Sequence, residues 1–358
     1  MPSESTRVTL VQVAAAAGVS LSTASLAFGE GKPISPGTRA KVLAAAGRLG
    51  YQGPDPRGRS LRSGRTGIIG VQVDAHVARA FRDPVVIGIL EGITDALADT
   101  TTAVLLLPDT LDDAGLHAAP VDGVVAAGCS PHLQRLRDVM GRRSVPVVTA
   151  GNQVDDQGCV GIENAAATVQ LARHLHGLGH RRIAIVALPP SQVGDARVAG
   201  ACEVFPDAEI VCATDSTIDA GWAATRDLLE RGTLRADGGG ATAVIAQSDL
   251  LAAGVIRAAE AAGLHVPRDL SVTGFDGIAI DGFDSHRLTT IRQHITEQGR
   301  RAAEAVLATL DEGAPLPGSP FPSSWCWATP PAPRRDRLRL PQLVHRRREQ
   351  RGVAVRIR

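Results

Sequence analysis

From residue 67 onward, short apolar runs alternate with segments whose apolar residues recur at the spacing of a helix. The apolar runs form a first series at 67–73, 104–107, 123–127 and 145–148, and a second series at 183–186, 208–211, 243–246 and 270–273. Helices are expected at 85–98, 165–178, 220–231 and 250–262. Such alternation predicts parallel sheets covered by helices. Two series therefore predict two Rossmann-like lobes, with a ligand cleft at the carboxyl ends of the strands.

The first fifty residues predict three short helices. Thr9 is a suitable N-cap for the first helix, Gly18 suits the turn after it, and Ser20 can cap the second. Ser35 followed by Pro36 is a typical start for the third. The residues expected to be buried are Leu10, Val13, Ala14 and Ala17, then Ala24 and Ala27, then Val42, Leu43, Ala46 and Leu49, while Leu21, Ser22 and Thr23 are expected to face outward. A hydroxyl-rich second helix suits a DNA major groove, although any small helical bundle shows similar stripes.

Charge is distributed unevenly along the chain, whose net charge is only +1. Residues 1–66 hold nine Lys or Arg against three acidic residues, whereas residues 67–333 hold nineteen basic and thirty-two acidic residues. Residues 334–358 hold ten Arg against two acidic residues. A basic head on an acidic body is typical of a DNA-binding module fused to a regulatory domain. The alternative is that charged terminal segments serve solubility alone.

Residues 53–66 are predicted to form a hinge between the head and the body. Asp55 can cap a short helix that starts at Pro56, but the glycine at position 58 costs about 1 kcal/mol relative to alanine. We therefore expect a segment that becomes helical only on DNA. Leu61 is an apolar residue among arginines and suits a wedge between base steps in the minor groove. A flexible linker rich in arginine and glycine is the equally supported alternative.

Several classes of protein are not expected. No apolar stretch reaches about 18 residues, and the N-terminus lacks the apolar run of a secretory signal, so we expect a cytoplasmic protein without a membrane span. The scattered cysteines are expected to be small buried apolar residues rather than metal ligands or disulfides; they are Cys129, Cys159, Cys202, Cys212 and Cys326. The sequence holds no P-loop, G-x-S-x-G motif or metal cluster, so neither catalysis nor a cofactor is predicted.

Three motifs occur in a fixed order in the N-terminal region. Ala17-Gly18-Val19-Ser20 leads into Ser22-Thr23-Ala24-Ser25, Ser35-Pro36 leads to Leu49-Gly50-Tyr51, and Arg59-Ser60-Leu61 follows. In this combination the chain resembles the lactose-repressor (LacI/GalR) family of bacterial transcription regulators. The resemblance implies major-groove contacts from Leu21, Ser22 and the next turn, phosphate or base contacts from Ser20, Thr23 and Ser25, and a minor-groove wedge at Leu61. Thr9 and Arg59 complete the expected DNA contacts. Leu26 replaces the family's usual arginine, so a bidentate contact to guanine is missing and the operator preference is expected to differ at that base pair.

The resemblance extends to a periplasmic-binding-protein-like core. The motifs that match include Leu178-Gly179-His180, Asp249 with Ala252-Ala253-Gly254, Gly274-Phe275-Asp276 and Leu288-Thr289-Thr290-Ile291. The resemblance implies that Arg197 and Asp249 bind polar groups of an effector and that Gln293 lines the cleft. A guanidinium facing a carboxylate suits the hydroxyls of a sugar. The plain alternatives are a surface salt bridge for Arg197 and a helix N-cap for Asp249. Asp74 and Phe81 lie where the family's usual asparagine and aromatic positions are partly replaced, and they complete the expected effector set.

Two further departures from the family concern the core and its end. Gly151 stands where many relatives have a ligand-binding aspartate. After Pro317, the sequence through Trp327 does not resemble the family's closing strand. The arginine-rich residues 331–358 are expected to be disordered, with added non-specific affinity for DNA as the alternative.

We therefore predict an α/β chain with an N-terminal all-α helix-turn-helix head and a two-lobed periplasmic-binding-protein-like Rossmann core. The expected parts are the head at 1–52, the hinge at 53–66 and the core at 67–330, with lobe 1 at about 67–160 and 293–330 and lobe 2 at about 161–292. The predicted function is a cytoplasmic homodimeric repressor that binds double-stranded operator DNA under the control of a small-molecule effector, a sugar by its chemistry. The alternatives are a solute-binding protein of the same fold, which the basic head disfavours, and a sugar-handling enzyme, which would need paired carboxylates in the cleft.

Overall fold

The computed structural model describes residues 8–28, 34–53, 60, 64–73, 77–128, 132–153, 158–235, 239–280, 288–313, 315–316 and 324–326. Contacts between residues divide the chain into two compact units. The first unit joins Met1–Ile162 to His294–Pro322, and the second joins Glu163–Gln293 to Ser323–Arg358. Each unit contains its own parallel sheet, and the first also includes a helical head.

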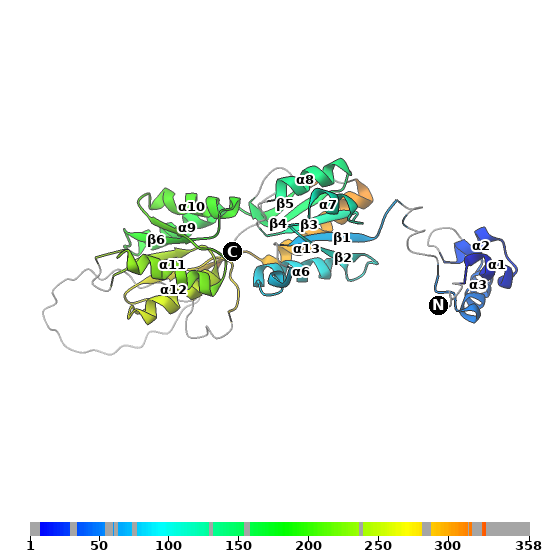
Figure 1. Cartoon of the computed structure of the whole chain (residues 1–358), viewed down its shortest axis with the longest axis horizontal. Coiled ribbons are helices and arrows are strands. Elements are labelled where there is room, and N and C mark those ends of the chain that lie inside the picture. Colours follow the sequence, from blue (N-terminus) through cyan, green and yellow to red (C-terminus); the bar gives the residue numbers. More distant parts are fainter. Residues whose placement is uncertain are drawn as a thin grey trace, which may run out of the picture. The chain divides into compact units, whose positions relative to one another are not determined.

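The head consists of α1 (Leu10–Ala17), α2 (Leu21–Ala27) and α3 (Pro36–Leu49), which Figure 1 shows in blue. Thr9, Ser20 and Ser35 are the N-caps, and each accepts a hydrogen bond from the backbone N–H three residues further on. Gly18 and Gly50 end α1 and α3 at φ values of 62° and 70°, which glycine adopts without steric cost. The three expected helices and their caps are therefore confirmed.

Small residues form the core of the head. Its buried side chains are Val13, Ala14, Ala17, Ala24, Ala27, Val42, Ala45 and Ala46. The expected burial of Leu43 and Leu49 is wrong, because these side chains are 45% and 38% exposed. Alanines in the core let the helices approach closely, so only a narrow stripe of α3 is covered. Ala45, about one turn after Val42, completes this stripe in place of Leu43.

The sheet of the first unit has five parallel strands in the order β2-β1-β3-β4-β5. The strands are β1 (Ile68–Val73), β2 (Ala103–Pro108), β3 (Gly123–Ala127), β4 (Val147–Gln153) and β5 (Cys159–Ile162), and the helices are α5 (Val77–Ala80), α6 (Pro84–Leu97), α7 (Asp113–Ala118), α8 (Leu133–Arg142) and α13 (Ile295–Glu312). Side chains of α6 and α13 form one hydrophobic core with the sheet, and those of α7 and α8 form another on its opposite face (Figure 1).

Two glycines allow α6 and α13 to cross in close contact. A Cβ added at Gly92 would lie 1.8 Å from the carbonyl oxygen of Thr296, and one added at Gly299 would lie 2.1 Å from the carbonyl oxygen of Ile89. No side chain tolerates contacts this short with backbone. The separation of the two helices is therefore one that only glycine permits.

We expect Gly92→Ala to lower the free energy of unfolding by about 2–3 kcal/mol, because α6 and α13 must move apart. Denaturation in urea, followed by circular dichroism, measures this change. Gly141→Ala in α8 is the matched control, since a Cβ there meets nothing within 4 Å. The control variant should be as stable as the wild type or slightly more so. Equal losses in both variants would show that the close crossing has no energetic importance.

The second unit contains four parallel strands in the order β7-β6-β8-β9. The strands are β6 (Ile183–Ala187), β7 (Glu209–Cys212), β8 (Ala243–Ala246) and β9 (Ser271–Thr273), and the helices are α9 (Asn164–Gly177), α10 (Gln192–Val204), α11 (Ile218–Glu230) and α12 (Asp249–Ala261). A separate antiparallel pair joins β10 (Thr290–Arg292) to β11 (Ser324–Cys326). The sequence after Pro317 does not resemble the family's closing strand, and the structure nevertheless forms β11 there. Residues 331–358, which were expected to be disordered, lie outside the described part.

The expected strands and helices of both series are confirmed within a few residues. The elements that the sequence analysis did not predict include α5, β5, α7, α8, α10, β10 and α13. The sheets of the two units have the same connectivity. In each sheet the second strand lies on one side of the first strand, and the later strands lie on the opposite side of the first strand. This repeat places a reversal of strand order in each sheet, between β1 and β3 and between β6 and β8.

The cysteines differ in their exposure. Cys159 is buried, Cys202 is half-buried and Cys212 is exposed. The expectation of buried cysteines is therefore met only by Cys159 among these three. Burial raises the pKa of the Cys202 thiol and so disfavours its reactive thiolate.

Neither a spanning helix nor a metal cluster was expected from the sequence. Among the described residues, no single helix is long and apolar enough to cross a membrane, and α1 and α2 reach the required length only as a pair bent by 101°. The same part of the chain holds no group of three or more His, Cys, Asp or Glu side chains placed to bind a metal ion.

Candidate functional site

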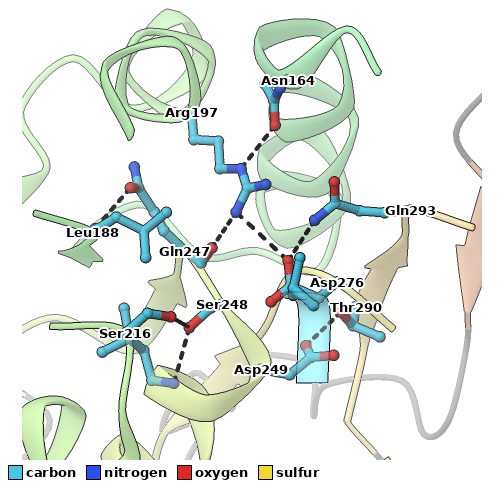
Figure 2. A network of polar contacts seen from close by, with 12 residues as sticks. Asn164, Leu188, Arg197, Ser216, Gln247, Ser248, Asp249, Asp276, Thr290 and Gln293 are labelled. Atoms are coloured by element: carbon cyan, nitrogen blue, oxygen red, sulfur yellow. Dashed lines mark hydrogen bonds and ion pairs between the residues drawn. The ribbon is translucent and has the colours of Figure 1, made fainter. Parts of the chain in front are cut away.

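Polar side chains gather at one end of the second sheet, where the strand order reverses. The chain passes from β6 to β7 on one side of the sheet and from β8 to β9 on the other side, so the strand order reverses between β6 and β8. Open parallel sheets bind ligands at the carboxyl ends of the strands where the order reverses. Gln247 directly follows β8, and Asp276 lies three residues after β9. Side chains from α9 and α10 reach the same place (Figure 2).

The Arg197 guanidinium is the centre of this network. Arg197 belongs to α10 and is only 3% exposed. Its Nε donates to Oδ1 of Asn164 at 2.9 Å, and its Nη1 donates to the carbonyl oxygen of Gln247 at 2.5 Å. Nη1 also lies 3.8 Å from Oδ1 of Asp276, and the guanidinium carbon lies 3.6 Å from the centre of the Phe275 ring. A surface salt bridge, the alternative for this arginine, is therefore wrong.

Asp276 supplies the carboxylate that pairs with this guanidinium. Its Oδ1 accepts a hydrogen bond from Nε2 of Gln293 at 2.5 Å, and its backbone N–H donates to the carbonyl of Ile291. The backbone of Asp276 has a φ of 124°, which is rare for a residue other than glycine. Such strain costs of the order of 1–3 kcal/mol and is found mainly where surrounding structure enforces it, often at binding sites.

Two buried amide side chains complete the network, and sequence reasoning missed both. Asn164 is the first residue of α9 and is fully buried. The Gln247 side chain accepts from the backbone N–H of Leu188 at 2.9 Å and donates to the carbonyl of Gly194 at 3.0 Å. It thereby fixes the connection from β6 to α10, which carries Arg197. Position is the signal that could have found Gln247, since it directly follows β8 at the point where the strand order reverses. Asn164 follows β5, a strand of the other sheet, so its position gives no such signal.

Asp249, which the sequence analysis expected to bind the effector, forms hydrogen bonds to a loop in this structure. Ser248 is the N-cap of α12, and Asp249 is the first residue of the helix. Oδ2 of Asp249 accepts hydrogen bonds from the backbone N–H groups of Gly277 and Ile278 at 2.7 and 2.9 Å, and Oδ1 accepts from the Thr290 hydroxyl at 2.6 Å. The N-cap alternative is therefore wrong. In this structure the carboxylate holds the loop that follows Asp276, instead of forming the ion pair with Arg197.

Burial raises the pKa of the Asp249 carboxyl to about 6. The hydrogen bonds from Thr290, Ile278 and Gly277 and the charge of Arg197 act in the opposite direction. Desolvation outweighs them because the side chain lies in the interior of the second unit, where Asp249 is 1% exposed. The loop next to Asp276 is therefore held by a carboxylate that takes up a proton in mildly acidic solution.

This titration predicts a pH dependence of stability. The pKa of about 6 in the folded chain exceeds the value of about 4 in an unfolded chain, so the stabilising contribution is complete below about pH 4 and is lost as the pH rises through 6. Two pKa units correspond to about 3 kcal/mol. We expect the free energy of unfolding of the wild type, minus that of Asp249→Asn, to fall by up to about this amount from pH 4 to pH 7.5.

Urea denaturation at a series of pH values measures this difference. Asp219→Asn changes an exposed carboxylate in the first turn of α11 and serves as the control. A wild-type curve parallel to that of Asp249→Asn at every pH would contradict the prediction.

The other expected effector residues belong to the first unit. Phe81 directly follows α5 and is 59% exposed, so its ring is accessible, while Asp74 lies outside the described residues. Gly151 has a φ of 80°, and an added Cβ would lie 3.4 Å from the Ile89 side chain. This positive φ favours glycine at the position.

The outward face of α2 carries the residues expected to contact DNA. Leu21 is 51% exposed, Ser22 is exposed, and Thr23, Ser25 and Leu26 are half-buried. The hydroxyl of Ser20 lies 2.8 Å from those of both Ser22 and Thr23. Thr9, exposed at the start of α1, belongs to the same set, whereas Arg59 and Leu61 lie outside the described residues. The structure thus gives the head an exposed cluster of hydroxyl groups at the start of α2.

Comparisons with known proteins agree with this architecture. Residues 9–53 match the model for bacterial regulatory proteins of the lacI family, and residues 172–327 match the model for a periplasmic binding protein-like domain. The HTH-type transcriptional regulator IpsA of Corynebacterium glutamicum is 31% identical over 342 residues, which cover 85% of this chain and 92% of that protein.

Two solved structures share the fold over nearly the whole chain. The lac repressor dimer bound to operator and the anti-inducer ONPF is 25% identical, with a TM-score of 0.76, and the match covers 91% of this chain and 99% of that one. A complex of the transcriptional regulator CelR with cellobiose is 27% identical, with a TM-score of 0.63, and the match covers 89% of this chain and 98% of that one.

A helix-turn-helix head joined to a periplasmic-binding-protein-like core defines a class of DNA-binding regulators. The chain belongs to the lacI family of bacterial regulatory proteins and is a helix-turn-helix transcriptional regulator. The solute-binding alternative without DNA regulation is not favoured, because the DNA-binding part of the family model matches as well.

Proposed function

We propose that this regulator is a repressor that binds operator DNA as a homodimer and responds to a small polyhydroxylated effector, a sugar, bound at Arg197. The observation that carries the proposal is the buried pairing of Arg197 with Asp276 at the carboxyl ends of the strands. A guanidinium and a carboxylate are expensive to bury, and they are retained where their donors and acceptors are used. The protein acts in the cytoplasm, where the DNA is, and catalyses no reaction.

The chemistry of the network favours neighbouring hydroxyl groups. Arg197 offers only donors and Asp276 only acceptors, while the amides of Asn164, Gln247 and Gln293 offer both. A sugar hydroxyl donates one hydrogen bond and accepts others, so a pair of adjacent hydroxyls matches a guanidinium beside a carboxylate. The similar regulator CelR was solved with cellobiose, which supports a carbohydrate effector.

DNA binding is assigned to the exposed start of α2. Leu21 and Ser22 would contact base edges in the major groove, and Ser20, Thr23, Ser25 and Thr9 would contact phosphates or bases. Leu26 takes the place of a guanine-reading arginine, so an apolar contact to a thymine methyl is expected there. Arg59 and Leu61 remain predictions for the minor groove. In a dimer, the two heads would bind half-sites related by two-fold symmetry, as in the lac repressor dimer on its operator.

The effector would control DNA binding by a shift in population. A ligand that binds one arrangement of the lobes more tightly than another shifts the equilibrium by its difference in affinity. The spacing of the two hinges would change with that arrangement, and the heads would then fit the operator less well.

Electrophoretic mobility shift tests the proposal directly. The probe is the duplex upstream of the protein's own gene, with an unrelated duplex of equal length as competitor, in the presence and absence of cellobiose and a panel of other sugars. Thermal unfolding identifies which sugar binds, because a ligand at 100 times its Kd stabilises by about 2.7 kcal/mol. A protein that binds no duplex at low salt, with or without sugars, would contradict the proposal.

A further inference from the structure

The carboxylate of Asp122 binds the chain where it leaves the hinge. Asp122 lies directly before β3, and its Oδ1 accepts hydrogen bonds from the backbone N–H and the hydroxyl of Thr66 at 2.8 and 2.9 Å. Its Oδ2 accepts from the backbone N–H of Gly67 at 2.7 Å. The Asp122 N–H in turn donates to the carbonyl of Ile68 at 2.9 Å. One half-buried carboxylate therefore ties two successive residues to the sheet with charge-assisted hydrogen bonds.

Arg65, the residue before Thr66, forms hydrogen bonds with another element of the same unit. Its Nη1 donates to Oδ1 of Asp311 at 2.6 Å, and its Nη2 donates to the carbonyl oxygen of Leu310. Both acceptors lie at the C-terminal end of α13, where helix carbonyls lack helical partners and carry the negative end of the helix dipole. The Arg65 and Asp311 side chains are 49% and 63% exposed, so this ion pair contributes little to stability. The two contacts place Arg65 next to the C-terminal end of α13.

We propose that Asp122 and Arg65 are positioning residues for DNA binding, which hold the end of the hinge at one point on the first unit. This inference rests on the proposed function, because it requires two heads that bind two half-sites. Thr66 is the last residue of the predicted hinge. Its own bonds to Asp122, together with those of the neighbouring Arg65 to α13, hold it next to the sheet. The distance that each head can reach is then set by the hinge residues before position 65 alone.

A fixed attachment makes the dimer selective for the spacing of half-sites. Each hinge is a short tether between a head and its anchored end. The two heads of a dimer therefore bind DNA together strongly only when the distance between the half-sites is one that the two hinges can span. Half-sites lie one helical turn apart or a multiple of it, so inserted base pairs move one site both along and around the duplex. Freeing residues 65–67 lengthens each tether and relaxes this requirement.

Asp122→Asn tests the inference. Asparagine replaces one acceptor oxygen by an NH2 donor, which then faces a backbone N–H. Two duplexes are compared by mobility shift: the footprinted region upstream of the protein's own gene, and the same region with two base pairs inserted between the half-sites. We expect the wild type to favour the natural duplex, and the ratio of the two Kd values to fall at least fivefold in Asp122→Asn. A general loss of stability would weaken both complexes equally and leave this ratio unchanged.

Asp138→Asn is the matched control, since Asp138 accepts from Gln134 on the exposed face of α8 in the same unit. The ratio should be that of the wild type. Hydrogen exchange of the Thr66 and Gly67 amides provides a readout in the absence of DNA, and Asp122→Asn should accelerate it. Should thermal unfolding show that Asp122→Asn does not fold, Thr66→Ala removes the hydroxyl's bonds to Asp122 and to the Ile68 N–H but keeps the two backbone bonds to Asp122, and it should lower the ratio less. A wild-type ratio in a folded Asp122→Asn overturns the inference but not the proposed function, whereas a wild type that binds neither duplex overturns both.

Arg65→Gln separates anchoring from a direct DNA contact. An arginine that neutralises a phosphate contributes about 0.9 to the slope of log affinity against log salt concentration. As an anchor, Arg65 should leave that slope unchanged on substitution while the spacing ratio falls. A slope that decreases by about 0.9 with an unchanged ratio would place Arg65 on the DNA and remove it from the anchor.

Discussion

Replacing Arg197 by methionine is expected to lower the free energy of unfolding by about 3–5 kcal/mol, because the substitution leaves a buried carboxylate without its partner. Asp276 would lose its ion pair, and the amide oxygen of Asn164 and the carbonyl of Gln247 would each lose a donor. The same variant should lose its response to the effector, since the group that would bind the ligand hydroxyls is gone. Urea denaturation and thermal shift with the identified sugar measure the two effects.

Arg173→Met is the control for this prediction. Arg173 pairs with Glu203, but both side chains are largely exposed, at 68% and 58%, so its loss should cost at most about 1 kcal/mol. Adding Asp276→Asn to Arg197→Met removes the unpaired charge and should recover part of the lost stability. An Arg197→Met variant as stable as Arg173→Met would mean that the buried network does not hold the second unit together.

Introducing a negative charge at Ser22 should weaken binding to the upstream duplex roughly a hundredfold, a difference of about 2.7 kcal/mol, because like charges brought together cost several kcal/mol. The folded head should be unaffected or slightly more stable. Ser22 is exposed in the first turn of α2, where a carboxylate interacts favourably with the helix dipole. Ser22→Asp is therefore expected to separate DNA binding from stability. Mobility shift and thermal unfolding give the two measurements.

Ala44→Asp places the same charge on an exposed position of α3 and controls for the change in net charge. Its effect on DNA binding should be several times smaller. Equal losses in the two variants would indicate that the head binds DNA through overall charge rather than through α2.

The sequence predicted many elements that have strong periodicity but missed α8, whose buried stripe is just as regular. In two other missed elements, α13 and β5, a physical reason hides the pattern. The helix α13 has its buried apolar positions at Ala302, Ala303 and Val306, but Gly299 interrupts the stripe one turn before them. That glycine is required by the crossing with α6, which is a property of the packed unit and not of the helix alone. The strand β5 has four residues, one of them glycine, and is recognisable only as the parallel neighbour of β4.

The sequence identified individual site residues but did not identify their partners. Arg197 and Gln293 were named, and they do meet in one network. The carboxylate facing Arg197 was expected to be that of Asp249, although Asp276 occupies that place in this structure. Both aspartates follow buried strands, so chain position alone does not separate them. The separation comes from backbone direction, because the loop after Phe275 turns its carboxylate toward Arg197 while the start of α12 turns Asp249 toward backbone N–H groups.

The backbone of Asp276 also restricts how this protein can diversify. At a φ of 124°, glycine is accommodated without strain, and asparagine and aspartate tolerate positive φ better than other residues do. Of these, only aspartate supplies a negative charge. Directed evolution for new effectors should therefore keep this aspartate and randomise the amide positions around it, where the backbone φ is not positive.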